Sequence, residues 1–246
     1  RARVAPFNVN YRYVKNELHY LLADSGATAL IYHATFAPRV NDVLRQLPKL
    51  RVLIQIADES GNDLVHGAVD YESIVRSGDA VLPPAEASPD DLYVLYTGGT
   101  TGMPKGVLWR QHDIFMTSFG GRNLYTGELA NSYEDIAKRV AEAPETRLMI
   151  LPPLMHGAAQ WAVMMAMTTG QSVVFSTITS RFDADEVVRT IEREKVMAVT
   201  VVGDAMARPL AAAIEEGTAD LSSLAVVANG GALLTPTAKR RLIEAK

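Results

Sequence analysis

Residues 96–106, Y-T-G-G-T-T-G-M-P-K-G, carry the groups in this chain that are best suited to binding an anion. Glycine lets the backbone approach a ligand closely and adopt positive φ, and successive exposed N–H groups form an anion-binding concavity. The threonine hydroxyls add donors, and Lys105 adds a positive charge. Apolar runs at 92–95 and 107–109 flank the stretch and predict a strand on each side of it. The stretch itself is therefore predicted to be a phosphate-binding loop between two strands. A flexible hairpin loop without a ligand is the alternative.

The loop does not follow the common nucleotide-binding patterns. A Walker A loop needs G-x-x-x-x-G-K-(S/T) between a strand and a helix, whereas here Pro104 precedes the lysine and Gly106 follows it. The stretch instead resembles the phosphate loop of the AMP-forming adenylating enzymes, a superfamily of acyl-CoA synthetases, luciferases and peptide-synthetase adenylation domains. That loop usually reads (Y/F)-T-S-G-T-T-G-x-P-K-G, and ten of eleven positions match, with Gly98 in place of serine.

Composition restricts the class of protein further. The 246 residues are 48% hydrophobic and 21% charged, which suits one large or two small domains. The net charge of −4 argues against a nucleic-acid surface, and the absence of cysteine fits a reducing compartment. No run reaches the ~18 apolar residues of a membrane span. We expect a cytoplasmic protein without a transmembrane segment, and leave peripheral membrane association and homo-oligomer formation open.

Helix and strand signals alternate along the chain, which predicts an α/β fold of layered, mostly parallel sheets with flanking helices. Predicted strands cover residues 28–32, 51–57, 147–151, 172–175, 197–202 and 225–228. Predicted helices cover residues 14–22, 36–47, 71–75, 132–143, 157–169, 183–194 and 204–216. Asp183 and Glu186 have the spacing of a capping box, and Thr235 followed by Pro236 predicts the start of a last helix.

Two later blocks are similar to motifs of the same superfamily. Residues 152–157, P-P-L-M-H-G, follow a predicted strand and resemble its P-x-x-H motif, which implies that His156 lies where the nucleotide and acyl sites meet. Residues 228–233, A-N-G-G-A-L, resemble its (S/G)-G-A block. That block implies a backbone along the adenine, formed by Gly230, Gly231 and Ala232. The alternatives are a capping or packed core histidine and an ordinary strand-to-helix turn.

The resemblance also implies an acyl pocket lined from the helix after His156 and from a strand-to-helix turn. Trp161, Val202 and Gly203 occupy the matching positions. Methionines 164, 165 and 167 on the same helix suit an adaptable apolar pocket, although such a stripe is more typical of a core. The charged run at 133–139 indicates a solvated helix face, with an insertion near the mouth of the site as the alternative.

Taken together, the resemblance implies an AMP-forming acyl-CoA synthetase that uses ATP, Mg²⁺ and CoA. Its substrate would be a small-molecule carboxylate, a fatty or steroid-side-chain acid as in actinobacterial synthetases. The residues implied for the β- and γ-phosphates are Thr97, Gly98, Gly99, Thr100, Thr101, Gly102 and Lys105. An adenylating ligase for an aromatic or amino acid and a non-catalytic nucleotide-binding module remain alternatives.

The expected organisation is a βα subdomain at residues 1–91 and a second subdomain at 92–246 that carries the phosphate loop and the acyl and adenine sites. The superfamily's Y-G-x-T-E block with its magnesium-binding glutamate, its ribose-binding aspartate and its small C-terminal domain with a catalytic lysine do not occur before Lys246. We therefore expect a fragment of the large N-terminal domain that is inactive alone.

Overall fold

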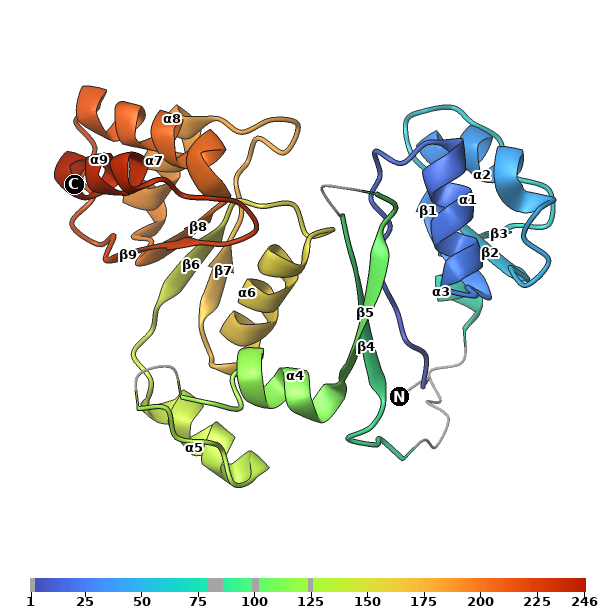
Figure 1. Ribbon diagram of the computed structural model, residues 1–246, viewed down its shortest axis with the longest axis horizontal. Coiled ribbons are helices and arrows are strands. Elements are labelled where there is room, and N and C mark those ends of the chain that lie inside the picture. Colours follow the sequence, from blue (N-terminus) through green and yellow to red (C-terminus); the bar gives the residue numbers. More distant parts are fainter. Residues whose placement is uncertain (1–2, 79–85, 99–101, 124–125) are drawn as a thin grey trace. The chain divides into compact units, whose positions relative to one another are not determined.

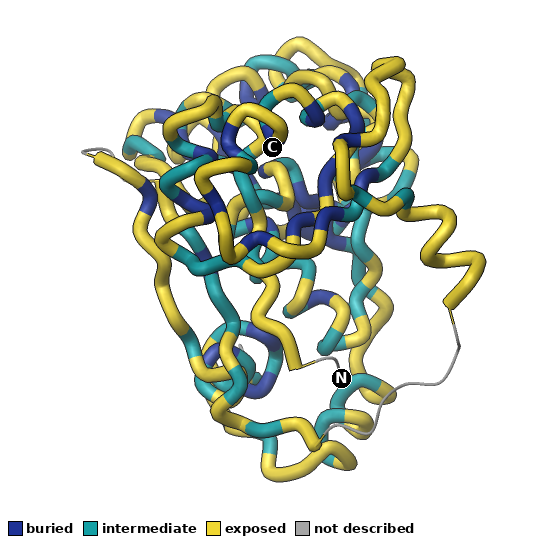
Figure 2. The backbone as a smooth tube through the Cα atoms, turned by 90° about the vertical axis from the view of Figure 1, so that its right-hand side faces the viewer, coloured by how far each residue is buried: buried dark blue, intermediate teal, exposed yellow. Residues whose placement is uncertain are grey.

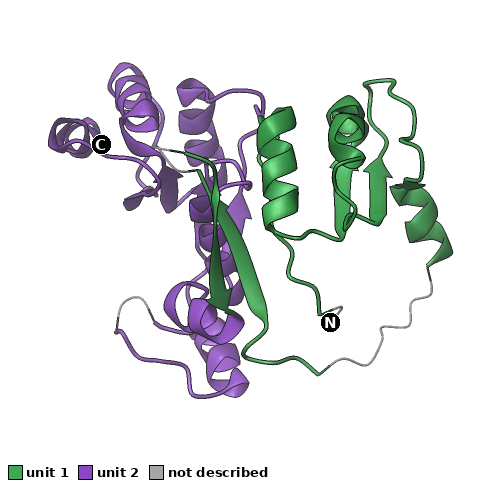
Figure 3. Ribbon diagram, turned by 45° about the vertical axis from the view of Figure 1, so that its right-hand side comes forward, with its two compact units in different colours: residues 1–110 green, residues 111–246 purple. Residues whose placement is uncertain are grey.

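The computed structural model describes residues 3–78, 86–98, 102–123 and 126–246. Contacts divide the chain into two compact units, residues 1–110 and 111–246 (Figure 3). The hairpin around the phosphate loop therefore groups with unit 1, whereas the sequence suggested a boundary between residues 91 and 92. That subdomain boundary stays a prediction, and each unit is described by itself below.

Unit 1 contains a three-stranded parallel sheet and an antiparallel hairpin. Its elements are α1 (Lys15–Asp24), β1 (Ala29–His33), the 3-10 helix η1 (Ala34–Phe36), α2 (Ala37–Leu44), β2 (Val52–Ile56), β3 (Val69–Asp70), α3 (Tyr71–Ser77), β4 (Leu92–Thr97) and β5 (Lys105–Arg110). The sheet order is β1-β2-β3. Helices α1 and α2 bury residues such as Leu22 and Val43 against Leu30 and Leu53 of the sheet. These elements confirm the helices and strands predicted there, while β3 was not predicted.

Unit 2 is built on a four-stranded parallel sheet of order β7-β6-β8-β9. Its elements are α4 (Gln111–Ser118), α5 (Tyr133–Glu142), β6 (Arg147–Ile150), α6 (Gly157–Thr168), β7 (Ser172–Val174), α7 (Ala184–Glu194), β8 (Ala198–Val201), α8 (Gly203–Glu216), β9 (Val226–Asn229) and α9 (Pro236–Ala245). The alternation predicted from residue 147 onward is confirmed. Helix α5 has no buried residue, which fits the solvated face expected for the charged run.

Both faces of the unit 2 sheet are covered (Figure 1). Leu148 and Ile150 of β6 pack with Ala159 and Ala166 of α6 on one face. Met149, between them in sequence, faces the other side and packs with residues of α7, α8 and α9. Because successive side chains of a strand point to opposite faces, one strand serves both cores. Figure 2 shows the buried positions in the strands and inner helix turns, with the connections more exposed.

Parallel strands covered on both faces direct the chain to one common edge, where the turns after β6, β8 and β9 all emerge. Those turns carry the blocks singled out from the sequence. None of the described helices combines the length and apolar character that crossing a membrane requires.

The capping box predicted at the start of α7 forms only in part. The Asp183 carboxylate accepts a hydrogen bond from the Glu186 N–H at 3.1 Å, as expected of an N-cap. Glu186 does not reach back to Asp183. Its buried carboxylate instead accepts from Ser176, from the N–H and hydroxyl of Thr177 and from the Thr190 hydroxyl. Burial alone would raise the pKa of Glu186, but these hydrogen bonds outweigh it and lower the pKa.

We predict that Glu186→Gln destabilises the intact protein by about 1–3 kcal/mol at neutral pH, because the amide replaces one accepting oxygen by an NH₂ group among partners that all donate to the carboxylate. Since the folded-state pKa lies below its usual value, the stabilisation is complete above that usual value and is lost as the pH falls through the folded-state pKa. The difference between Glu186→Gln and wild type should therefore shrink on acidification. Chemical denaturation at neutral and acidic pH measures it.

Asp185→Asn is the matched control, since Asp185 lies in the same first turn and is exposed. It should leave stability nearly unchanged at both pH values. Equal losses for the two variants, or a Glu186→Gln effect that does not depend on pH, would contradict a role for the buried carboxylate.

Candidate functional site

The phosphate-loop residues lie at the end of the β4–β5 hairpin in unit 1. Thr97 is paired with Lys105 in antiparallel register, and the Thr97 hydroxyl donates to the Lys105 carbonyl oxygen at 3.4 Å. Both residues are exposed. Three of the predicted phosphate ligands, residues 99–101, lie outside the described residues. The hairpin confirms the strand–loop–strand arrangement that separates this loop from a Walker A loop, in which a helix follows.

Open space surrounds the two described glycines of the loop. A Cβ added to Gly98 or to Gly102 would have no described atom within 4 Å apart from its chain neighbours. Neither glycine is therefore required by packing within the described structure. Room for a ligand near the backbone is what the phosphate-loop prediction needs from these positions.

Tyr96 anchors the hairpin where its strands enter the loop, and sequence reasoning did not single it out. Its hydroxyl donates to the Asp24 carboxylate at 2.8 Å, at the end of α1, and its ring centroid lies 5.3 Å from that of Phe7. Desolvation, followed by the hydrogen bond to Asp24, raises the pKa of Tyr96 to about 12. Across the hairpin, a Cβ on Gly106 would lie 3.0 Å from the Tyr96 ring. The motif contains this tyrosine, but the 72 positions between Tyr96 and Asp24 hide the contact.

His156 stands at the N-cap position of α6, immediately before Gly157. Its backbone N–H donates to the Pro153 carbonyl at 3.0 Å, and its carbonyl accepts from Gln160. The imidazole makes no capping hydrogen bond to the helix and is exposed. The structure therefore disfavours both alternatives, the capping histidine and the packed core histidine. The predicted functional role of His156 stays a prediction.

The turns after β8 and β9 meet closely. A Cβ on Gly203 would lie 2.6 Å from the Leu233 carbonyl oxygen and 2.9 Å from the Ala232 Cβ, and Gly203 has φ of +56°. A Cβ on Gly231 would lie 3.9 Å from a Val202 methyl group. The predicted acyl residues Val202 and Gly203 therefore lie against the predicted adenine residues Gly231 and Ala232.

The start of α6 also reaches this junction. A Cβ on Gly230 would lie 3.4 Å from the Ala158 Cβ, two residues after His156. The structure thus brings the two predicted turns together with the start of α6, the helix that begins directly after His156. The phosphate loop belongs to the other unit.

The apolar residues of α6 divide between core and surface. Met165 packs on the core beneath the sheet, while Met164 and Met167 are 40% and 68% exposed. Trp161 is half-buried. The core interpretation therefore holds for Met165 alone, and the predicted lining of an acyl pocket by Trp161 stays a prediction.

Sequence reasoning did not predict the side-chain hydrogen bonds that join this junction. Asn229 bonds to both turns, and the Asp204 carboxylate accepts from the N–H and hydroxyl of Thr235 at 2.8–3.1 Å. The salt bridge from Arg208 adds to the Thr235 hydrogen bond in lowering the pKa of Asp204. Asn229 precedes the two glycines in the sequence, which was the available signal.

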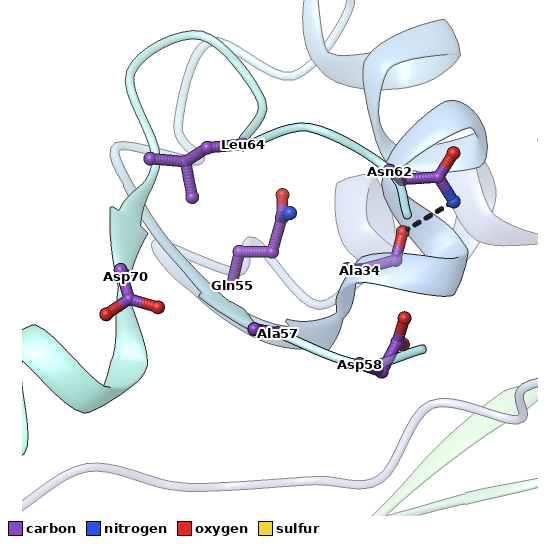
Figure 4. A pocket seen from close by; sticks show the side chains of 7 residues that line it. All are labelled: Ala34, Gln55, Ala57, Asp58, Asn62, Leu64 and Asp70. Carbon is purple, nitrogen blue, oxygen red and sulfur yellow. Dashed lines mark hydrogen bonds between the residues drawn. The ribbon is translucent and has the colours of Figure 1, made fainter. Parts of the chain in front are cut away.

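A shallow cavity of about 190 Å³ lies in unit 1, beyond the carboxyl ends of β1 and β2 (Figure 4). Its polar side chains are engaged with the surrounding loops. Gln55 accepts from Tyr32 and Val65 and donates to the Asp63 carbonyl, and Asn62 donates to the Ala34 carbonyl. The polar side chains that line the cavity are therefore used to hold the surrounding loops together, and we call this region the loop junction of unit 1.

Magnesium ligands were not predicted within this chain. Across the part of the chain that the structure describes, no group of three or more His, Cys, Asp or Glu residues could hold a metal ion.

Comparison with known proteins yields one family and several close relatives. A family model described as AMP-binding enzyme matches residues 1–245. A medium-chain acyl-CoA ligase from Mycobacterium avium is 75% identical over 99% of this chain and 44% of its own length. A medium/long-chain-fatty-acid–CoA/3-oxocholest-4-en-26-oate–CoA ligase from Mycobacterium tuberculosis is 43% identical over 96% of this chain and 43% of its own length. The chain thus spans less than half the length of these curated relatives.

Among solved structures, a long-chain-fatty-acid-CoA ligase from Archaeoglobus fulgidus aligns with a TM-score of 0.73 at 22% identity, over 99% of this chain and 44% of that one. This likeness supports the fold alone. Because the family model covers residues 1–245, the chain belongs to the AMP-binding enzyme family.

Proposed function

We propose that the protein carrying this chain is an AMP-forming acyl-CoA synthetase for medium- to long-chain fatty acids or steroid-side-chain acids. The observation that carries this proposal is the 75% identity to a medium-chain acyl-CoA ligase over 99% of the chain. The relative with 43% identity, whose name includes both fatty-acid and steroid acids, supports the same substrate class.

The proposed reaction has two steps. A carboxylate oxygen first attacks the α-phosphorus of ATP, so that a C–O–P bond forms, the bond to the β-phosphate oxygen breaks and pyrophosphate leaves. The thiolate of CoA then attacks the acyl carbonyl carbon, so that a C–S bond forms and AMP leaves. Because the carboxylate is already a nucleophile, the barrier lies in bringing anions together and stabilising charge on the leaving phosphates.

The chain's residues have distinct roles in this proposal. The loop of unit 1, with the Thr97 hydroxyl and the Lys105 ammonium group, binds the β- and γ-phosphates. Backbone at Gly230–Ala232 lies along the adenine. His156 separates nucleotide from acyl chain, and Trp161 with the Val202–Gly203 turn contacts the acyl chain. The support is the exposed loop donors and the meeting of three blocks at one edge of the unit 2 sheet.

Magnesium is an expected requirement of the intact protein, because a divalent cation offsets the charge of the phosphates. Within the described residues, no group of three or more His, Cys, Asp or Glu side chains is available to hold it.

The direct test is pyrophosphate release by the intact protein with ATP and a series of carboxylates. We expect release that depends on a medium- or long-chain fatty acid or a steroid-side-chain acid, and acyl-CoA formation once CoA is added. Activity restricted to aromatic or amino acids, with transfer to a carrier protein in place of CoA, would favour the alternative ligase. ATP binding without pyrophosphate release for any carboxylate would favour a non-catalytic nucleotide-binding module.

A second prediction concerns the glycine that replaces the usual serine of the phosphate loop. Gly98→Ser adds a hydroxyl donor where no described atom lies within 4 Å. If the loop binds phosphates, the variant should lower the KM for ATP by roughly twofold to tenfold, the range expected for one hydrogen bond. Its melting temperature should not change. Steady-state kinetics at varied ATP concentration provide the measurement.

Gly106→Ser is the matched control at the other end of the same loop. Its Cβ would press on the Tyr96 ring at 3.0 Å, and the Tyr96 hydroxyl is bound to Asp24. We expect a loss of about 1–3 kcal/mol in stability from this overpacking. A higher KM for ATP in Gly98→Ser, at unchanged stability, would argue against phosphate binding at this position.

A further inference from the structure

The side chain of Asn229 joins the two turns that emerge from neighbouring strands. Its Oδ1 accepts a hydrogen bond from the Gly203 N–H at 2.7 Å, and its Nδ2 donates to the Ala232 carbonyl oxygen at 2.9 Å. The orientation of the amide follows from the partners, because one is an obligatory donor and the other an obligatory acceptor. A carboxylate or a hydrocarbon side chain could not satisfy both.

The backbone alone does not hold these turns together. Strands β8 and β9 pair as far as Val201 opposite Asn229, and the Gly230 N–H still donates to the Val201 carbonyl at 3.2 Å. Beyond that point Gly203 and Gly231 both take positive φ, and the chain leaves the ladder. The Asn229 amide thus bridges the turns directly after regular pairing ends.

The bond from Asn229 to Ala232 also closes a short loop around Gly230 and Gly231. Glycine loses more conformational freedom on ordering than any other residue, so a pair of glycines needs an external constraint to keep one backbone conformation. One side chain supplies that constraint and ties the loop to the turn at Gly203.

We propose that Asn229 is a positioning residue, whose carboxamide sets the spacing between the Gly230–Ala232 backbone and the Val202–Gly203 turn. This inference rests on the proposed function, in which the first segment contacts the nucleotide and the second the acyl chain. Asn229 itself need not touch either substrate. Its loss should alter how ATP and the carboxylate are held relative to each other.

The test is Asn229→Asp in the intact protein. Aspartate keeps the acceptor for the Gly203 N–H but places an oxygen against the Ala232 carbonyl, so the segment with the two glycines is released. We expect kcat/KM for ATP to fall roughly 10-fold to 100-fold, as misplacement of substrate does in other sites. The KM values for ATP and carboxylate should rise, and the loss should differ between short and long acyl chains.

Asn62→Asp is the matched control. Asn62 Nδ2 also donates to a backbone carbonyl, that of Ala34 at 3.1 Å, in the loop junction of unit 1 (Figure 4). We expect wild-type kinetics from this variant. If Asn229→Asp does not fold, Asn229→Ser serves instead, because its neutral hydroxyl is too short to bridge both turns.

The outcomes separate the two proposals. A uniform loss of kcat with unchanged KM values and an unchanged chain-length profile would mean a purely structural role and would overturn the positioning role. So would kinetics equal to those of Asn62→Asp. Absence of pyrophosphate release from wild-type protein would overturn the proposed function and this inference with it.

Discussion

The site in unit 2 depends on how closely two backbone turns approach each other at the carboxyl edge of the parallel sheet. Parallel pairing of β8 and β9 makes the turns neighbours, but side chains ordinarily keep such turns apart. At Gly203 the missing Cβ allows the Leu233 carbonyl to approach to a distance that no other residue would permit. The Gly203 N–H is then satisfied by Asn229, and the Leu233 carbonyl accepts from the Asp204 N–H.

The phosphate loop meets a different constraint. A loop that leads into a helix can use the partial positive charge at the helix N-terminus to bind an anion, but the loop between β4 and β5 leads into a strand. In the proposed function, its attraction for phosphate comes from N–H groups, hydroxyls and the Lys105 ammonium group. Such a loop needs its two strand ends held in register. Tyr96 holds them through its hydrogen bond to the Asp24 carboxylate and the packing of its ring against Gly106.

The sequence predicted those features that depend on residues close together in the chain. The period of apolar residues located the sheets and most helices, and the Asp183 cap followed from spacing alone. Sequence reasoning misjudged Glu186, because the hydroxyls of Ser176 and Thr177 outcompeted the local backbone N–H for that carboxylate. The hydrogen bond between Tyr96 and Asp24 could not be predicted either, since a contact between residues 72 positions apart leaves no trace in one sequence.

The glycine-rich blocks show how far the candidate site can be predicted from the sequence. A pattern of glycines marks backbone that approaches something closely, and residues 230–232 were selected because they also resemble the superfamily's (S/G)-G-A block. It does not show which of the glycines serve a ligand and which serve the fold. Gly203 and Gly106 are required by neighbouring protein atoms, whereas Gly98 and Gly102 face open space. Nor does the pattern reveal which side chain holds Gly230 and Gly231 in one backbone conformation, because any side chain with one acceptor and one donor at the right spacing could do so. Asn229 meets that requirement here, with one acceptor toward the Gly203 N–H and one donor toward the Ala232 carbonyl.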